Sequence, residues 1–123
     1  MKTDKSHILD IIKNLRQKVD DIEGCAVISK DGLLIASDLR ANTDSGVLAA
    51  MGAEIAKSRG IVMSELKMGD PLQVILNSTK GEIIVSNVGK RAVLVCLLKL
   101  KANLGMVLFH MNRAGGHIIP FIK

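Results

Sequence analysis

Apolar residues recur in three parts of the chain with the three- and four-residue spacing of an amphipathic helix. These parts predict helices over residues 4–22, 44–59 and 103–119. Gly24 and Gly60 follow the first two stretches and Pro120 follows the third, so each helix is expected to stop there. Small residues outnumber larger apolar ones in the second helix. Their small side chains allow another element to pack closely, either the helix's own sheet or a second helix.

Five shorter runs are rich in apolar residues and predict strands; the first, second and fifth are apolar on consecutive residues, which is typical of strands covered on both faces. The runs are Cys25–Ile28, Leu33–Ala36, Leu72–Asn77, Ile83–Asn87 and Ala92–Leu98. Asp31-Gly32 between the first two predicts a tight hairpin, because glycine tolerates the positive φ of such turns. The third run follows Pro71 and contains Gln73 and Asn77, so we expect it at a sheet edge.

The elements follow the order α-β-β-α-β-β-β-α, which predicts an α+β fold in a single domain of residues 1–123. Short turns join successive strands, so the five-stranded sheet should be mainly antiparallel, with helices on both faces. Five strands make a sheet about 24 Å wide, while one helix covers about 10 Å. Two helices nearly cover one face, and the third leaves about half of the other face bare. Because the strands are apolar on both faces, we expect a second copy or a partner to cover the rest.

Positive charge is concentrated in the second half of the chain. Residues 1–60 hold nine Lys/Arg and nine Asp/Glu, while residues 61–123 hold eight against three, which gives the net charge of +5. A basic half suits an acidic protein, nucleic acid or another polyanion, and it also suits ordinary solvated charges at strand ends. Non-specific binders of single strands stack bases on aromatic side chains, whereas this chain has two Phe and no Tyr or Trp. A polyanion or nucleic-acid binding module is therefore kept as an alternative function.

The sequence contains no recognisable pattern for a catalytic, cofactor or metal site. Gly89-Lys90 is followed by Arg91 rather than Ser or Thr, so it is not a P-loop. His110 and His117 share a helix face about 10.5 Å apart, beyond the reach of one ion. The two cysteines lie in apolar strands, and we expect buried, reduced thiols. No apolar run approaches the ~20 residues of a membrane span. We therefore expect a cytoplasmic protein that is not an enzyme.

Three stretches of the sequence resemble the Roadblock family of dynein-light-chain-like domains. They are the hairpin Gly24–Ser37, the Ala-rich helix at Val47–Ala56, and the path from Leu94–Leu98 through Lys101–Gly105 into the last helix. The resemblance covers about residues 5–122, and the related longin and profilin-like folds fit the element order less well. It implies a non-catalytic platform in which two copies align their third strands and second helices to form one continuous sheet. It also implies binding or regulation of NTPases, including small Ras-like GTPases in prokaryotes.

The bare sheet face and the edge strand independently predict a homodimer. The expected interface consists of the edge strand and the small residues of the second helix: Leu72, Gln73, Val74, Ile75, Leu76, Asn77, Ala49, Gly52, Ala53 and Ala56. We expect the NTPase partner to dock beside these helices, oriented by Glu54, Lys57 and Arg59 near an exposed helix end.

Overall fold

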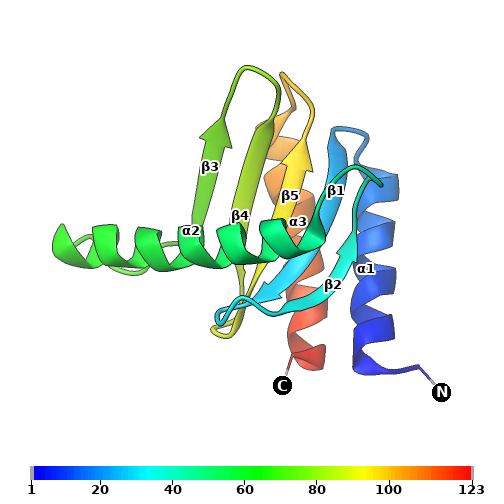
Figure 1. The fold of residues 1–123 in the computed structure, drawn as a ribbon, viewed down its shortest axis with the longest axis horizontal. Coiled ribbons are helices and arrows are strands. Elements are labelled where there is room, and N and C mark those ends of the chain that lie inside the picture. Colours follow the sequence, from blue (N-terminus) through cyan, green and yellow to red (C-terminus); the bar gives the residue numbers. More distant parts are fainter. Residues whose placement is uncertain (1, 123) are drawn as a thin grey trace.

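The computed structural model describes residues 2–122, which form three α-helices, five β-strands and one short 3-10 helix (Figure 1). The helices are α1 (Asp4–Lys18), α2 (Ser45–Glu65), α3 (Leu104–Ile118) and the 3-10 helix η1 (Ile119–Phe121). The strands are β1 (Ile22–Ser29), β2 (Leu34–Asp38), β3 (Gln73–Asn77), β4 (Glu82–Val88) and β5 (Ala92–Leu98). This order confirms the predicted α-β-β-α-β-β-β-α arrangement.

The five strands form one antiparallel sheet in the order β2-β1-β5-β4-β3. β5 lies at its centre, where every residue except Leu97 is buried. This placement explains its seven consecutive apolar residues, since a central strand covered on both faces has no solvated side. β2 and β3 are the two edges of the sheet. The expected edge position of the third strand is therefore confirmed.

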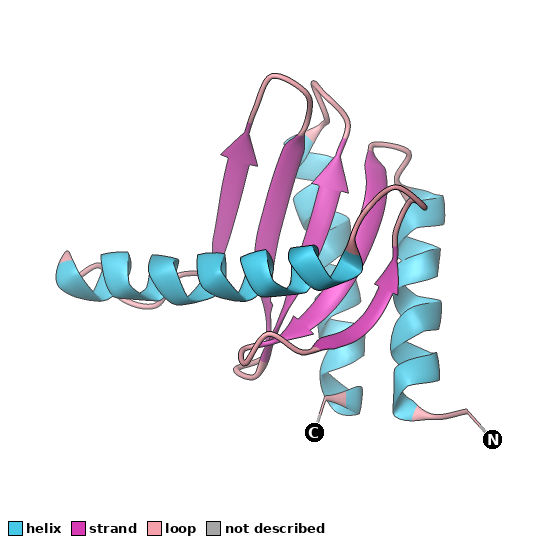
Figure 2. Cartoon of the chain, in the orientation of Figure 1, coloured by secondary structure: helices cyan, strands magenta, loops and turns pink. Residues whose placement is uncertain are grey.

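Helices lie on both faces of the sheet, but they cover the two faces unequally (Figure 2). α1 and α3 lie side by side along the strands on one face. α2 crosses the strands on the other face and projects beyond β3 (Figure 1). The buried cluster beneath α1 and α3 is the larger of the two. The smaller cluster, beneath α2, consists of Ala26, Ile28, Ala49, Val85, Val93 and Val95.

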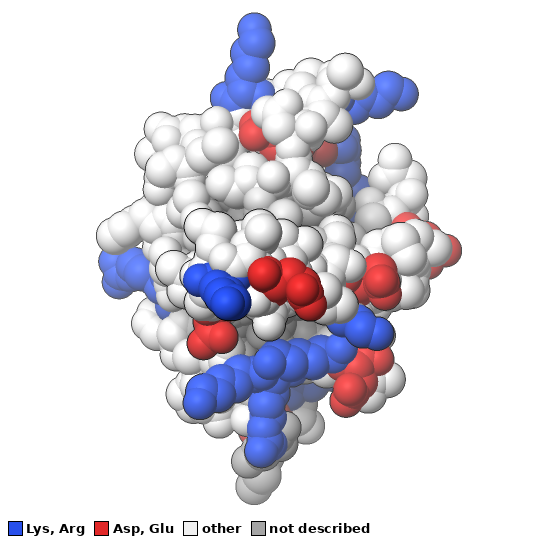
Figure 3. Space-filling view, turned by 90° about the vertical axis from the view of Figure 1, so that its left-hand side faces the viewer, with Lys and Arg blue, Asp and Glu red and all other residues white. Residues whose placement is uncertain are grey.

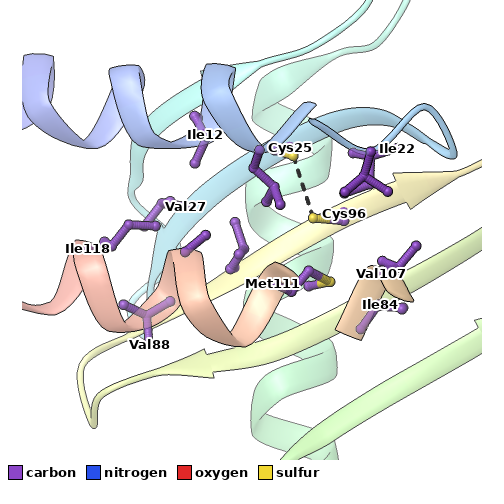
Figure 4. Packing of buried hydrophobic residues seen from close by; sticks show 14 of the residues in the cluster. Ile12, Ile22, Cys25, Val27, Ile84, Val88, Cys96, Val107, Met111 and Ile118 are labelled. Carbon is purple, nitrogen blue, oxygen red and sulfur yellow. Dashed lines mark hydrogen bonds between the residues drawn. The ribbon is translucent and has the colours of Figure 1, made fainter. Parts of the chain in front are cut away.

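The larger cluster is aliphatic and encloses both cysteines (Figure 4). Ile12 of α1 and Met111 of α3 are both buried against the sheet. Cys25 of β1 pairs directly with Cys96 of β5, and their Sγ atoms lie 3.5 Å apart as free thiols. Burial raises the pKa of the Cys96 thiol well above its ordinary value, because a buried site disfavours the charged thiolate. The expected burial of both thiols is confirmed.

Two helix ends differ from the predictions. α1 ends at Lys18, because Val19 is already extended and Ile22 opens β1. Both residues are buried. Their helical spacing therefore predicted burial correctly, but it predicted a helix where the chain is extended. α2 continues through Gly60 to Glu65, so the predicted end near Arg59 was wrong. A glycine costs a helix only about 1 kcal/mol relative to alanine, and a helix of 21 residues tolerates that cost.

Candidate partner-binding surface

β3 presents an open edge whose backbone groups alternate between β4 and the outside. The Asn87 N–H donates to the Leu72 carbonyl oxygen at 3.4 Å, so these two residues form a hydrogen-bonded pair. Such pairs alternate with non-bonded pairs along an antiparallel ladder. The backbone N–H and C=O groups of Val74 and Leu76 therefore point toward β4. The residues between them direct their N–H and C=O groups away from β4, and these are Gln73, Ile75 and Asn77. Another strand can pair with this edge.

A row of apolar side chains beside α2 is only partly covered. Leu76 pairs with Ile83 and Ile83 pairs with Leu97, so all three lie on the same face of the sheet. It is the α2 face, because the neighbouring row contains Val85 and Val95 of the cluster beneath α2. Leu76 is 43% exposed, and the other two residues of the row are half-buried. α2 thus leaves part of its sheet face uncovered, as the dimensions of the elements predicted.

α2 lies close to the sheet because its small residues face it. Ala49 is buried, and a Cβ added at Gly52 would lie 2.8 Å from Cδ1 of Ile28. Ala53 and Ala56 are half-buried. We expected Ala49 and Gly52 to contact a second copy, but both pack against the chain's own sheet.

One side of α2 carries larger apolar residues, which we call the α2 seam: Leu48, Met51, Ile55 and Val62. Their spacing of three, four and seven residues places them along one side of the helix. The same geometry places Ala53 and Gly60 on the opposite side. Met51 and Val62 are more than half exposed. The seam was absent from the predicted interface, although its spacing is visible in the sequence.

The side of the molecule with the β3 edge and the projecting end of α2 combines uncharged areas with charged side chains of both signs (Figure 3). In this view much of the upper part is white, Lys or Arg side chains protrude at its top, and charged side chains of both signs lie in the middle and lower parts. Several apolar side chains of α2 and the loop after it are more than half exposed, namely Ile61, Val62, Leu66, Met68 and Leu72. Val62 belongs to the α2 seam and Leu72 directly precedes β3, so exposed apolar residues lie both on the helix and beside the edge strand.

The three predicted partner-binding residues lie in different environments. Glu54 and Lys57 are exposed on α2. Arg59 is half-buried, and its Nη2 donates a hydrogen bond to Oδ1 of Asn87. Its Nε and Nη1 atoms are enclosed without a hydrogen-bond partner. Burial lowers the pKa of the Arg59 guanidinium, because desolvation disfavours its charged form. The expectation that Arg59 is exposed at a helix end was wrong, because α2 continues to Glu65.

The polar groups of the described residues were also compared with the requirements of a metal site. Within residues 2–122, no three His, Cys, Asp or Glu side chains gather in a way that could hold a metal ion. His110 and His117 line a groove between α1 and α3 together with Lys18 and Arg113. No helix in the described part of the chain is long and apolar enough to cross a membrane.

Comparisons with known proteins agree on one family and one fold. The family model of the Roadblock/LC7 domain matches residues 8–98. Two uncharacterized proteins of Methanocaldococcus jannaschii are each 32% identical to this chain over 101 residues, which cover 82% of this chain and 88% of theirs.

Solved structures give the same picture. A Roadblock/LC7 domain from Streptomyces avermitilis is 26% identical with a TM-score of 0.71, covering 89% of this chain and 96% of its own. MglB of Myxococcus xanthus is 22% identical with a TM-score of 0.85, covering 92% of each chain. Profilin II of Acanthamoeba castellanii is 16% identical with a TM-score of 0.64, covering 89% of this chain and 94% of its own. The last two matches show that this chain shares the fold of MglB and of profilin II.

Proposed function

Because this chain belongs to the Roadblock/LC7 family, we propose that it is a non-catalytic homodimer that binds and regulates a small Ras-like GTPase or another NTPase. One observation carries the proposal: the apolar surface made by β3, the Leu76–Ile83–Leu97 row and the α2 seam is incompletely covered. Apolar area left in water costs about 25 cal/mol per Å², and a large apolar patch marks an interaction site. A second copy of the chain fits this patch.

A dimer with its two-fold axis beside β3 pairs the free strand edges and covers the bare part of each sheet face. The two β3 strands pair antiparallel through the outward backbone groups of Gln73, Ile75 and Asn77. Each α2, which already projects beyond its own β3 (Figure 1), then lies over the partner's uncovered row. The two seams pack against each other, because a two-fold axis places the same patch on both sides of an interface.

The dimer interface proposed here keeps the predicted β3 residues and shifts the contribution of α2. Leu48, Met51, Ile55 and Val62 make the helix contact, since they lie beside the uncovered row and are at least partly exposed. Ala49 and Gly52 act indirectly, because they set how closely α2 approaches its own sheet. Ala53 and Ala56 lie away from the seam.

The NTPase partner docks on the outer side of the paired α2 helices in this proposal. Glu54 and Lys57 are exposed there and supply one negative and one positive charge at the rim of the docking surface. Rim charges of both signs orient a partner and raise its association rate more than its affinity. Catalysis is assigned to the partner, whose own site binds the nucleotide.

Light scattering on the purified full chain at tens of micromolar tests the dimer first. A mass of twice the chain is expected, and a monomer at that concentration would refute the proposed assembly. The partner is tested by capturing binding proteins from a native lysate with the tagged chain, after nuclease treatment. Recovery of a GTPase that also binds the chain when both are purified supports the function. Recovery that nuclease abolishes would instead favour the polyanion-binding alternative.

A further inference from the structure

A pocket of about 580 Å³ lies against α2 on the side opposite the seam. Three separate segments bring four cationic side chains to it. Lys30 comes from the turn after β1, Lys57 and Arg59 from α2, and Lys90 from the turn between β4 and β5. Asp70 is the only carboxylate among the lining residues, so the lining carries four positive charges and one negative, a net charge of +3.

Arg59 is held in place within this pocket by its neighbours. Oδ1 of Asn87 accepts a hydrogen bond from the guanidinium, and Nδ2 of Asn87 donates to the carbonyl oxygen of Pro71 at 2.8 Å. The second bond fixes the orientation of the amide, so Asn87 presents its oxygen to Arg59. None of the ion pairs found in residues 2–122 involves Arg59. A half-buried cation with enclosed, unpaired N–H groups is therefore left without a counter-charge, which costs free energy.

Small residues keep the pocket open between these cations. Ala53, Ala56 and Gly60 line it from α2, and Gly89 lines it from the turn. Gly89 has a φ of +60°, which allows the tight turn that places Lys90 at the rim. No aromatic side chain lines the pocket, so it offers charge recognition without a surface for stacking a base.

We propose that this pocket binds a small phosphate-bearing anion of the pyrophosphate class. Several negative charges on a compact ligand match cations that converge from three segments, whereas a single carboxylate would leave most of them unpaired. Arg59 provides a positive charge fixed in the pocket wall by Asn87, and the lysines provide mobile point charges whose ammonium groups can contact the ligand. Bound there, the anion links α2 to the turns at one end of the sheet. The site stays open in the proposed dimer, because it lies across α2 from the seam.

Inorganic pyrophosphate is the probe, titrated into the purified full chain at constant ionic strength by calorimetry and ³¹P NMR. We expect saturable binding of one pyrophosphate per chain. Lys90→Gln should weaken it about tenfold, since a hydrogen bond to a charged group is removed. Asp70→Asn should tighten it several-fold, because one repelling charge is lost. Lys99→Gln is the matched control, since it removes the same charge from an exposed residue after the other end of β5.

The outcomes separate a built site from general attraction to a basic protein. Absence of saturable binding to the wild type at millimolar pyrophosphate overturns the proposal. Equal weakening by Lys90→Gln and Lys99→Gln also overturns it, because net charge alone would then explain the binding. Arg59→Gln should weaken binding at least as much as Lys90→Gln, with thermal unfolding recorded beside it because the bond to Asn87 is lost. These measurements need no GTPase, so a failure to bind pyrophosphate would not contradict the proposed function. A monomeric wild type would likewise not contradict the proposed anion site.

Discussion

At the scale of single residues, Gly52 sets the distance between α2 and the sheet. A Cβ there would lie 2.8 Å from Cδ1 of Ile28 and 3.3 Å from Cγ2 of Val95. Gly52→Val should therefore lower the free energy of unfolding by about 1–3 kcal/mol, the usual cost of overpacking a core. Denaturant unfolding of the purified variant measures this difference.

Gly60 is the matched control in the same helix. A Cβ added at Gly60 meets no atom within 4 Å. Gly60→Ala should raise the free energy of unfolding by up to about 1 kcal/mol, because alanine is the better helix former. Destabilisation of both variants by the same amount would show that helix conformation, not contact with the sheet, decides the effect at Gly52.

The Cys96 thiol predicts a dependence of stability on pH. Its pKa is raised in the folded state by burial and by its contact with Cys25. At a pH where the unfolded chain has lost this proton, the folded chain still holds it, so stability falls as pH rises. The stability that the protonated thiol contributes is fully present below about pH 8.5, the ordinary thiol pKa. Above that pH we expect the free energy of unfolding to fall steadily with rising pH, because only the unfolded chain releases this proton.

Cys96→Ala removes the titrating group and provides the control. The variant should be less stable at neutral pH, because a buried sulfur is lost from the core. Its unfolding free energy should nevertheless decline less steeply above pH 8.5. Identical slopes for the variant and the wild type between about pH 8.5 and 10 would refute the assignment of this loss to Cys96.

At the scale of elements, the alternating groups of β3 allow its two edges to be tested separately. The Ile75 N–H points away from β4, whereas that of Val74 points toward it. Ile75→Pro should leave the β3–β4 ladder intact but remove a donor that a second strand needs, so we expect a folded monomer. Val74→Pro should instead disrupt the chain's own sheet and lower its thermal stability.

Light scattering and thermal unfolding distinguish these two outcomes. The expected pattern is loss of the dimer with a folded chain for Ile75→Pro, and loss of folded protein for Val74→Pro. A stable dimer of Ile75→Pro at micromolar concentration would rule out pairing through the β3 edge.

The sequence predicted these elements to different degrees, for physical reasons. The limits of β5 matched to the residue, because an unbroken apolar run between polar turns has one interpretation at the centre of a sheet. The end of α2 was wrong because Gly60 resembles a helix stop, while the actual stop is made by Lys67 with a φ of +57°. A positive φ at lysine has no signal in the sequence.

The candidate sites were less predictable than the elements. Small residues in α2 indicated a close contact but could not say whether the sheet or a second helix makes it, and the structure places Gly52 on the sheet. Lys30 and Lys90 lie far from Lys57 in the sequence, and the folding of two turns beneath α2 brings them together. Such a convergence depends on tertiary structure, so local patterns do not contain it.

At the scale of the whole molecule, the charges at the rim of α2 should govern how fast a partner arrives. Lys57→Glu reverses an exposed charge and should lower the association rate of the GTPase several-fold in low salt, with a smaller effect in high salt. Stopped-flow mixing of purified proteins measures the rate, and the mass of the dimer should not change.

Two variants show whether the position of this charge matters. Lys13→Glu reverses an equivalent exposed charge on α1, on the far face of the sheet, and should leave the association rate within about twofold. Lys57 also lines the cationic pocket. Lys90→Gln alters that pocket without changing the outer side of α2, so it shows whether a change in association rate comes from the pocket or from the docking surface. If Lys57→Glu and Lys13→Glu slow association equally, the partner does not dock on α2.

The projecting end of α2 makes the protein's resistance to degradation depend on its concentration. Ile61, Val62 and Leu66 lie at the end that extends past β3 (Figure 1), and all three are more than half exposed. A helical end without support from packing is marginal in water and opens readily. A lone chain therefore offers proteases and chaperones an unsupported apolar segment, whereas in the proposed assembly a sister chain shelters it. Chains made in small numbers would be cleared first, and the protein would persist only where enough of it is made for the copies to meet.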